Sequence, residues 1–88
     1  MMILSPNQAI PMAAKPKKWR GTVKGMLKAE LKRRDISYSE LAEKLRTVGV
    51  EESERNIANK ISRGTFTAIF FVQCLKAIGC RSIHLDDA

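Results

Sequence analysis

The hydrophobic pattern of this chain is clearest between residues 36 and 64, where it predicts two helices joined by a glycine turn. Ser37 and Glu40 have the spacing of a capping box, and Ile36 is placed to pack on Leu41. The first helix should therefore begin near Tyr38. The apolar residues on one face of this helix are Tyr38, Leu41, Ala42, Leu45 and Val48.

A second helix is expected after Gly49, which supplies the stop signal of the first. Ser53 is its candidate cap and Gly64 its end. Only a narrow stripe is apolar, formed by Ile57, Ala58 and Ile61. The other face carries side chains able to hydrogen-bond bases or phosphates, namely Glu54, Arg55, Asn56, Asn59, Lys60 and Arg63. This composition suits a DNA-recognition helix, and it equally suits the solvated face of a small helical domain.

Upstream, a helix is predicted from apolar residues that fall one turn apart, at Trp19, Val23, Leu27 and Leu31. Pro16 suits its first turn. Gly21 and Gly25 each cost roughly 1 kcal/mol relative to alanine, which makes the first half weak. We therefore expect the dependable helix to span about residues 22–34, with Thr22 as a candidate cap.

The last predicted helix follows Thr67 as its cap, ends at Gly79 and is apolar almost all round. One buried face needs only Ala68, Phe71, Val72, Leu75 and Ile78. The surplus residues are Ile69, Phe70 and Cys74. A small domain seldom leaves such side chains exposed without using them, so Ile69 and Phe70 should cover a dimer interface or pack under Trp19 and the N-terminal arm. We favour the dimer.

One domain is expected from 88 residues, with a flexible basic arm at 1–18, a helical domain at 19–80 and a tail at 81–88. The net charge of +7 is unevenly distributed. The first 20 residues contain no acid, and their cations are Lys15, Lys17, Lys18 and Arg20. The charges of residues 51–88 cancel. A basic flank beside a near-neutral recognition helix suits a protein anchored by phosphate contacts, although the lysines also favour solubility.

Other candidate chemistry is scarce. Cys74 and Cys80 should be buried thiols in a reducing cytoplasm, since two cysteines form no disulfide framework. With one histidine, His84, and no paired carboxylates, nucleophile–base pair or phosphate-binding glycine loop, the chain predicts neither a zinc site nor an enzyme with a cofactor or small-molecule substrate. No apolar run approaches the about 20 residues of a membrane-spanning helix, and the first residues do not resemble an export signal. We expect a soluble protein without a membrane partner.

The order of these motifs resembles the lambda-repressor-like (Cro/C1) helix-turn-helix domains. The resemblance covers about residues 22–80. Its most specific parts are Ile36-Ser37 leading into Leu41-Ala42-Glu43-Lys44-Leu45, and Leu75-Lys76-Ala77-Ile78-Gly79. The chain is also similar to a group of short, uncharacterised bacterial proteins that share an RNIANKISRGTF-like segment. The resemblance implies a compact four-helix domain that binds double-stranded DNA.

Carried over residue by residue, the cap before the family's second helix falls on Ser37. The next position, commonly a glutamine that touches DNA, falls on Tyr38. The start of the recognition helix falls on Ser53, Glu54, Arg55 and Asn56, with Asn59 one turn later. The connection before Glu54 is several residues longer than the family's tight turn. We assign base contacts to Arg55, Asn56 and Asn59, and phosphate contacts to Lys15, Lys17, Lys18, Arg20, Tyr38, Ser53, Lys60 and Arg63.

The leading hypothesis is thus a non-enzymatic, sequence-specific DNA-binding protein that acts as a dimeric transcriptional regulator. The alternative is a protein–protein docking module that uses Ile69, Phe70 and the apolar last helix. RNA binding is a third hypothesis, but the few aromatic residues are not interleaved with basic ones as in a stacking platform.

Overall fold

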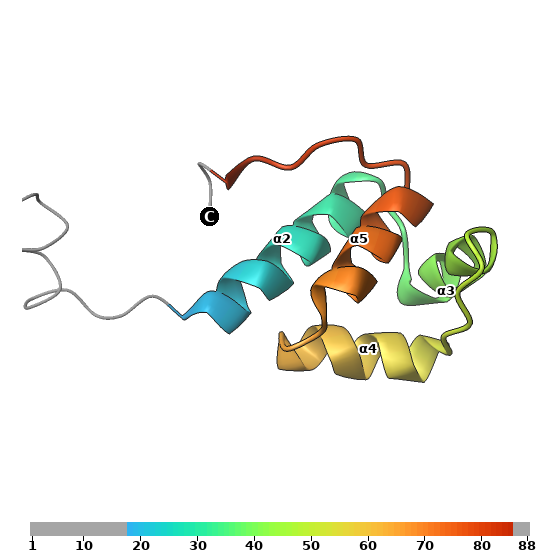
Figure 1. Ribbon diagram of the computed structural model, residues 1–88, viewed down its shortest axis with the longest axis horizontal. Helices are drawn as coiled ribbons and strands as arrows, with labels where there is room; N and C mark the ends of the chain where they lie inside the picture. The colour runs from blue at the N-terminus through green and yellow to red at the C-terminus, as the bar shows by residue number, and fades with distance from the viewer. Residues whose placement is uncertain (1–17, 86–88) are drawn as a thin grey trace, which may run out of the picture.

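The computed structural model describes residues 18–85, which form four α-helices and no strand (Figure 1). The helices are α2 (Trp19–Arg33), α3 (Tyr38–Arg46), α4 (Glu54–Arg63) and α5 (Ala68–Ala77). The predicted all-α class is therefore confirmed for this part of the chain. The predicted arm lies outside the described residues except for Lys18.

Two helices, α2 and α3, each pack against both α4 and α5, and all four contribute to one core. Each helix contributes apolar side chains to this core. The buried residues are Leu27, Leu31, Leu41, Ala42, Leu45, Ile57, Ile61, Phe70, Cys74 and Ile78. Within residues 18–85, no polar or charged side chain is fully buried.

The predicted caps of α3, α4 and α5 are confirmed. The Glu40 amide donates to Ser37 Oγ at 3.1 Å, and the Ser37 amide donates to Glu40 Oε1 at 2.9 Å, completing the capping box. Ser53 and Thr67 cap α4 and α5 by accepting hydrogen bonds from backbone amides three residues later, each at 3.0 Å. Gly64 ends α4 in the left-handed conformation, with φ of +68°.

Helix α2 begins earlier than its sequence predicts. It starts at Trp19, so both weak helix formers, Gly21 and Gly25, lie inside it. Thr22 is not the cap, because its hydroxyl donates instead to the Lys18 carbonyl at 3.4 Å. Tertiary contact overrides the low propensity of this segment, because the first turns of α2 lie against the end of α4. Trp19 itself is exposed instead of contributing to the core.

The predicted buried face of α5 was partly wrong. Phe70 and Cys74 are buried, with Phe70 only 4% exposed, whereas Ile69 and Val72 are 70% and 62% exposed. Ala68 is exposed too. Phe70 packs edge-to-face on Phe66, with ring centroids 5.7 Å apart. Phe70 therefore belongs to the core and is not available for the dimer interface to which we assigned it.

Two smaller features complete the fold. Helix α3 ends at Arg46, so Val48 lies in the following turn and is exposed instead of extending the buried face. After α5, residues 80–85 pass back over α2 without forming a strand (Figure 1). Ile83 and His84 line a cavity of about 170 Å³ with residues of α2. Residues 80–85 thus lie on the side of the domain away from α4 (Figure 1).

Candidate nucleic-acid interface

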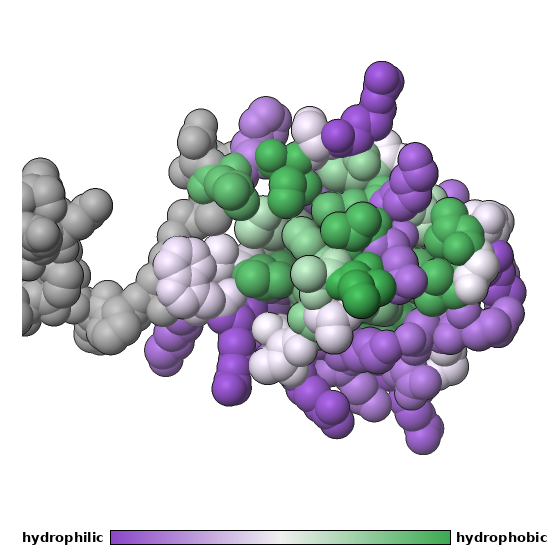
Figure 2. All heavy atoms as spheres, in the orientation of Figure 1, coloured by the Kyte–Doolittle hydropathy of each residue, from purple (hydrophilic) through white to green (hydrophobic). Residues whose placement is uncertain are grey.

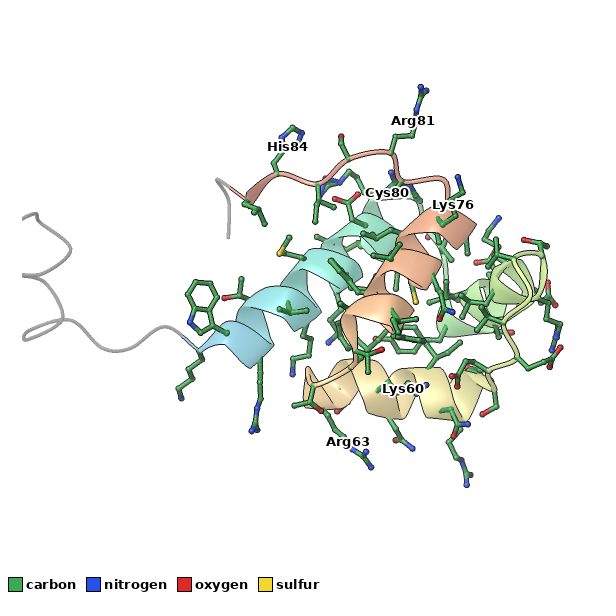
Figure 3. The ribbon with its side chains drawn as sticks, in the orientation of Figure 1. Lys60, Arg63, Lys76, Cys80, Arg81 and His84 are labelled. Carbon is green, nitrogen blue, oxygen red and sulfur yellow. The ribbon has the colours of Figure 1, made fainter. Side chains whose placement is uncertain are left out.

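The outer face of α4 is polar and open to solvent. Ile57 and Ile61 are fully buried, and their burial directs the other side of the helix outward. The three predicted base readers, Arg55, Asn56 and Asn59, are exposed, as is Arg63. Figure 3 shows Arg63 extending from α4 away from the body of the domain. In Figure 2 hydrophilic residues cover the side formed by α4, whereas apolar ones gather over α5 and residues 80–85.

The start of α2 meets the end of α4, which brings sequence-distant cations together. A Cβ atom built on Gly64 would lie 2.6 Å from the Arg20 carbonyl oxygen, so only glycine permits this approach. Lys24 Nζ donates to the Ser62 carbonyl at 3.1 Å and ties the same two segments. Arg20 and Lys18 are exposed beside this contact. A basic surface therefore runs from the first turn of α2 to Arg63.

Lys24 is a member of this surface that our sequence reasoning missed. It follows Arg20 by four residues, a spacing that places two side chains on one face of a helix. If residues 19–25 had been predicted as helix, this spacing would have placed Lys24 beside Arg20. The two glycines obscured it, because they moved the expected start of the helix to residue 22.

Lys60 differs from the other cations of α4. Its side chain is half-buried, and its ammonium forms an ion pair with Glu52. The same nitrogen lies 4.8 Å from the centroid of the Phe70 ring. Both partners keep the ammonium against the domain, so the structure does not support the phosphate contact that we predicted for Lys60.

Tyr38 and Ser53 also have structural roles. The Tyr38 ring packs against the core, and burial raises the pKa of its hydroxyl. The ring is therefore part of the core edge, one of the two roles that the sequence left open. The Ser53 hydroxyl accepts a hydrogen bond from the backbone amide of Asn56. Lys15 and Lys17 fall outside the described residues.

A second feature without a sequence prediction is a hollow of about 180 Å³ where α4 meets α5. Its lining combines Lys60 and Arg63 with Thr65, Phe66, Thr67 and Phe70. Thr65 is exposed there, beside Arg63. This hydroxyl adds a hydrogen-bonding group to the basic end of α4, which suits a phosphate oxygen.

Charge along α4 is polarised. Glu54 is exposed at its first residue, while Arg63 stands at its last turn. Glu51, just before the helix, lies 3.8 Å from Arg46 on the surface. Glu54 in the first turn and Arg63 in the last turn both fit the helix dipole, and Arg63 adds positive charge where α4 meets α2.

Two negative findings apply to residues 18–85. No cluster of three or more His, Cys, Asp or Glu side chains is arranged to hold a metal ion. None of the four helices combines the length and apolar character needed to cross a membrane.

Comparison with known proteins identifies one family. A family model described as "Domain of unknown function (DUF6471)" matches residues 19–83, which include all four helices. No curated protein and no solved structure matches the chain.

Proposed function

The chain belongs to the DUF6471 family, and we propose that it is a non-enzymatic, sequence-specific DNA-binding protein with a lambda-repressor-like helix-turn-helix fold. In this proposal α3 and α4 form the helix-turn-helix, and α4 enters the major groove. One observation carries the proposal. The exposed polar face of α4 is continuous with the cations at the start of α2, which a contact at Gly64 brings to the same edge.

Arg55 and Asn59 are the base readers in this arrangement, with Asn56 beside them. Both are exposed, and they lie four residues apart on the side opposite the buried isoleucines. An arginine pairs with the two acceptors of guanine, and an asparagine pairs with the acceptor and donor of adenine. The exposed face of α4 therefore offers side chains that discriminate between base pairs.

Phosphate contacts come from Lys18, Arg20 and Arg63, which are exposed around the α2–α4 contact. Thr65 adds a hydroxyl at the same end. Lys15 and Lys17 extend this set in the proposal, since they lie within three residues of Lys18 in a segment without acids. Such contacts fix the position of α4 in the groove and make binding salt-dependent without reading sequence.

Selection from random duplex DNA tests this function. We expect enrichment of a defined site, and Arg55→Ala should weaken binding to that site by about 1–3 kcal/mol and relax the preference at one base pair. Lys76→Ala is the matched control, because Lys76 is an exposed cation of α5 on the side away from α4 (Figure 3). The proposal fails if no site is enriched, or if both variants bind like the parent protein.

We also propose that the protein acts as a dimeric regulator, with Ile69 and Val72 at the contact. These exposed residues lie three apart on α5, and packing them against a second copy would remove apolar surface from water. Two half-sites about 34–36 Å apart are then expected on the DNA. Sedimentation should report a dimer that Ile69→Glu dissociates. A protein that remains monomeric at all concentrations would overturn the proposed dimer.

The second candidate function, a protein-docking module, uses the same exposed part of α5 for a different chain. It is favoured by the exposure of Ile69 and Val72, which the core does not require. Heparin chromatography separates the two functions. A DNA-binding protein is retained in a salt-dependent way through its cations, whereas a docking module of this kind does not need such retention.

A further inference from the structure

Lys60 joins three segments that are separate in the sequence. It belongs to α4, its ammonium pairs with Glu52 from the connection between α3 and α4, and the same ammonium lies 4.8 Å from the ring centroid of Phe70 in α5. Phe70 is in turn fixed by the core and by its edge-to-face contact with Phe66. A single side chain thus links the α3–α4 connection to a buried residue of α5.

The two neighbouring carboxylates of this connection have opposite environments. The Glu52 side chain is 15% exposed, whereas that of Glu51 is 85% exposed. A carboxylate that is largely removed from water is stabilised by an opposite charge with good geometry, and removal of one partner leaves the other without compensation. The Glu52–Lys60 pair therefore constrains the end of the connection, while Glu51 is a surface residue of the same charge.

The connection needs such a constraint because it is long. It spans residues 47–53, and its start is held by the Val50 amide, which donates to the Leu45 carbonyl at 2.9 Å. Its end is held by the Glu52–Lys60 pair just before Ser53 caps α4. These two attachments fix both ends of a segment whose length alone would permit several orientations of α4.

We propose that Lys60 is a positioning residue that sets the orientation of α4 through Glu52 and Phe70, so that Arg55 and Asn59 face outward together. The proposal rests on the proposed DNA-binding function, but it assigns Lys60 no contact with DNA. Lys60 acts on recognition through the groups that it holds. In the structure the ammonium is engaged by both of these groups.

The first test compares Glu52→Gln with Glu51→Gln. Each removes one negative charge next to α4, and electrostatics alone predicts that both bind duplex DNA more tightly. Loss of the pair with Lys60 predicts the opposite sign for Glu52→Gln. We expect Glu52→Gln to weaken binding to the selected site by about tenfold, equivalent to 1.4 kcal/mol, while Glu51→Gln strengthens it slightly. Equal strengthening by both variants would overturn the proposal.

The second test compares Lys60 with Arg63. Lys60→Met keeps the apolar stem and removes the charge, so affinity for the selected site should fall with an unchanged salt slope. Arg63→Gln should instead lower the slope by about 0.9, as expected for one lost phosphate contact. Lys60→Arg should restore most of the affinity, because a guanidinium also pairs with carboxylates and stacks on aromatic rings. A salt slope reduced by Lys60→Met would show a direct phosphate contact.

A measurement without DNA keeps the two proposals distinguishable. In Lys60→Met, amide hydrogen exchange should increase in residues 50–56 and remain unchanged in α2, because the attachment of the connection is lost locally. If the parent protein binds no duplex DNA but Lys60→Met shows this increase in exchange, the DNA-binding function is wrong and the role of Lys60 in holding α4 stands. If exchange in this segment is unchanged, the positioning role is wrong whether or not DNA is bound.

Discussion

Replacement of Gly64 by alanine tests the contact on which the proposed interface depends. Gly64 has φ of +68°, a conformation that costs roughly 1–2 kcal/mol for a residue with a side chain. The added Cβ would also lie 2.6 Å from the Arg20 carbonyl oxygen and 3.1 Å from its carbonyl carbon. Both atoms belong to the backbone of α2, so rotation of a side chain cannot relieve the contact. Overpacking of this kind costs about 1–3 kcal/mol.

We therefore expect Gly64→Ala to lower the free energy of unfolding by about 2–5 kcal/mol, the sum of the two effects. Gly49→Ala is the matched control. Gly49 has φ of +82°, but a Cβ there meets nothing within 4 Å, so this variant should show the conformational cost alone. Gly25→Ala should have the opposite sign, with a gain of about 0.5–1 kcal/mol, because that glycine is helical and has open space beside it.

Urea unfolding followed by far-ultraviolet circular dichroism measures all three variants. The reasoning is refuted if Gly64→Ala costs no more than Gly49→Ala, because the difference between them isolates the approach of α2 to α4. Gly64→Ala should also weaken binding to all duplexes, since relief of the contact moves Arg20 away from the end of α4. In a domain of this size, a loss of 2 kcal/mol lowers the melting temperature by roughly 10 °C.

Two further predictions concern ionisation. The hydrogen bond from Arg34 lowers the pKa of Glu30, and hydrogen bonds with Ser37 lower the pKa of Glu40. The stability that these carboxylates contribute is therefore fully present above their usual pKa of 4.5 and is lost as the pH falls through their pKa values in the folded protein. Urea midpoints should fall in acid, and Glu30→Gln should reduce that dependence; an unchanged pH profile would contradict the assignment. Burial raises the pKa of the Cys74 thiol to about 12, so alkylation at mildly alkaline pH should modify Cys80 in the folded protein and reach Cys74 only after unfolding. An adduct on Cys74 that mass spectrometry detects before unfolding would contradict the burial of this thiol.

The starts of α3, α4 and α5 and the glycine stop signals were predictable because their determinants are local. Ser37, Ser53 and Thr67 each bond an amide three residues later, and such a bond needs no information from the rest of the fold. The left-handed Gly49, Gly64 and Gly79 are equally local signals. The burial of Ile57 and Ile61 also follows directly from their spacing in a helix that is otherwise polar.

The buried face of α5 was not predictable in the same way. Almost every position of this helix is apolar, so hydrophobic periodicity does not distinguish one face from another. The packing partner decides, and here Phe66 and the core select Phe70 and Cys74 over Ala68 and Val72. The start of α2 was also not predictable from local sequence, because this turn is held by contacts with the distant residues Ser62 and Gly64.

The position of Lys60 shows how a polar helix face divides into two kinds of residue. At 100° per residue, Lys60 lies about 80° from the centre of the stripe formed by Ile57 and Ile61, whereas Arg55, Asn56, Asn59 and Arg63 lie about 120° or more away. A lysine at the border of an apolar stripe lays its stem along the apolar surface, and its ammonium then needs a partner there. Glu52 and the Phe70 ring provide that partner, although neither is near Lys60 in helical spacing. The sequence therefore contains the evidence that Lys60 differs from the other cations of α4, but only the fold reveals what it holds.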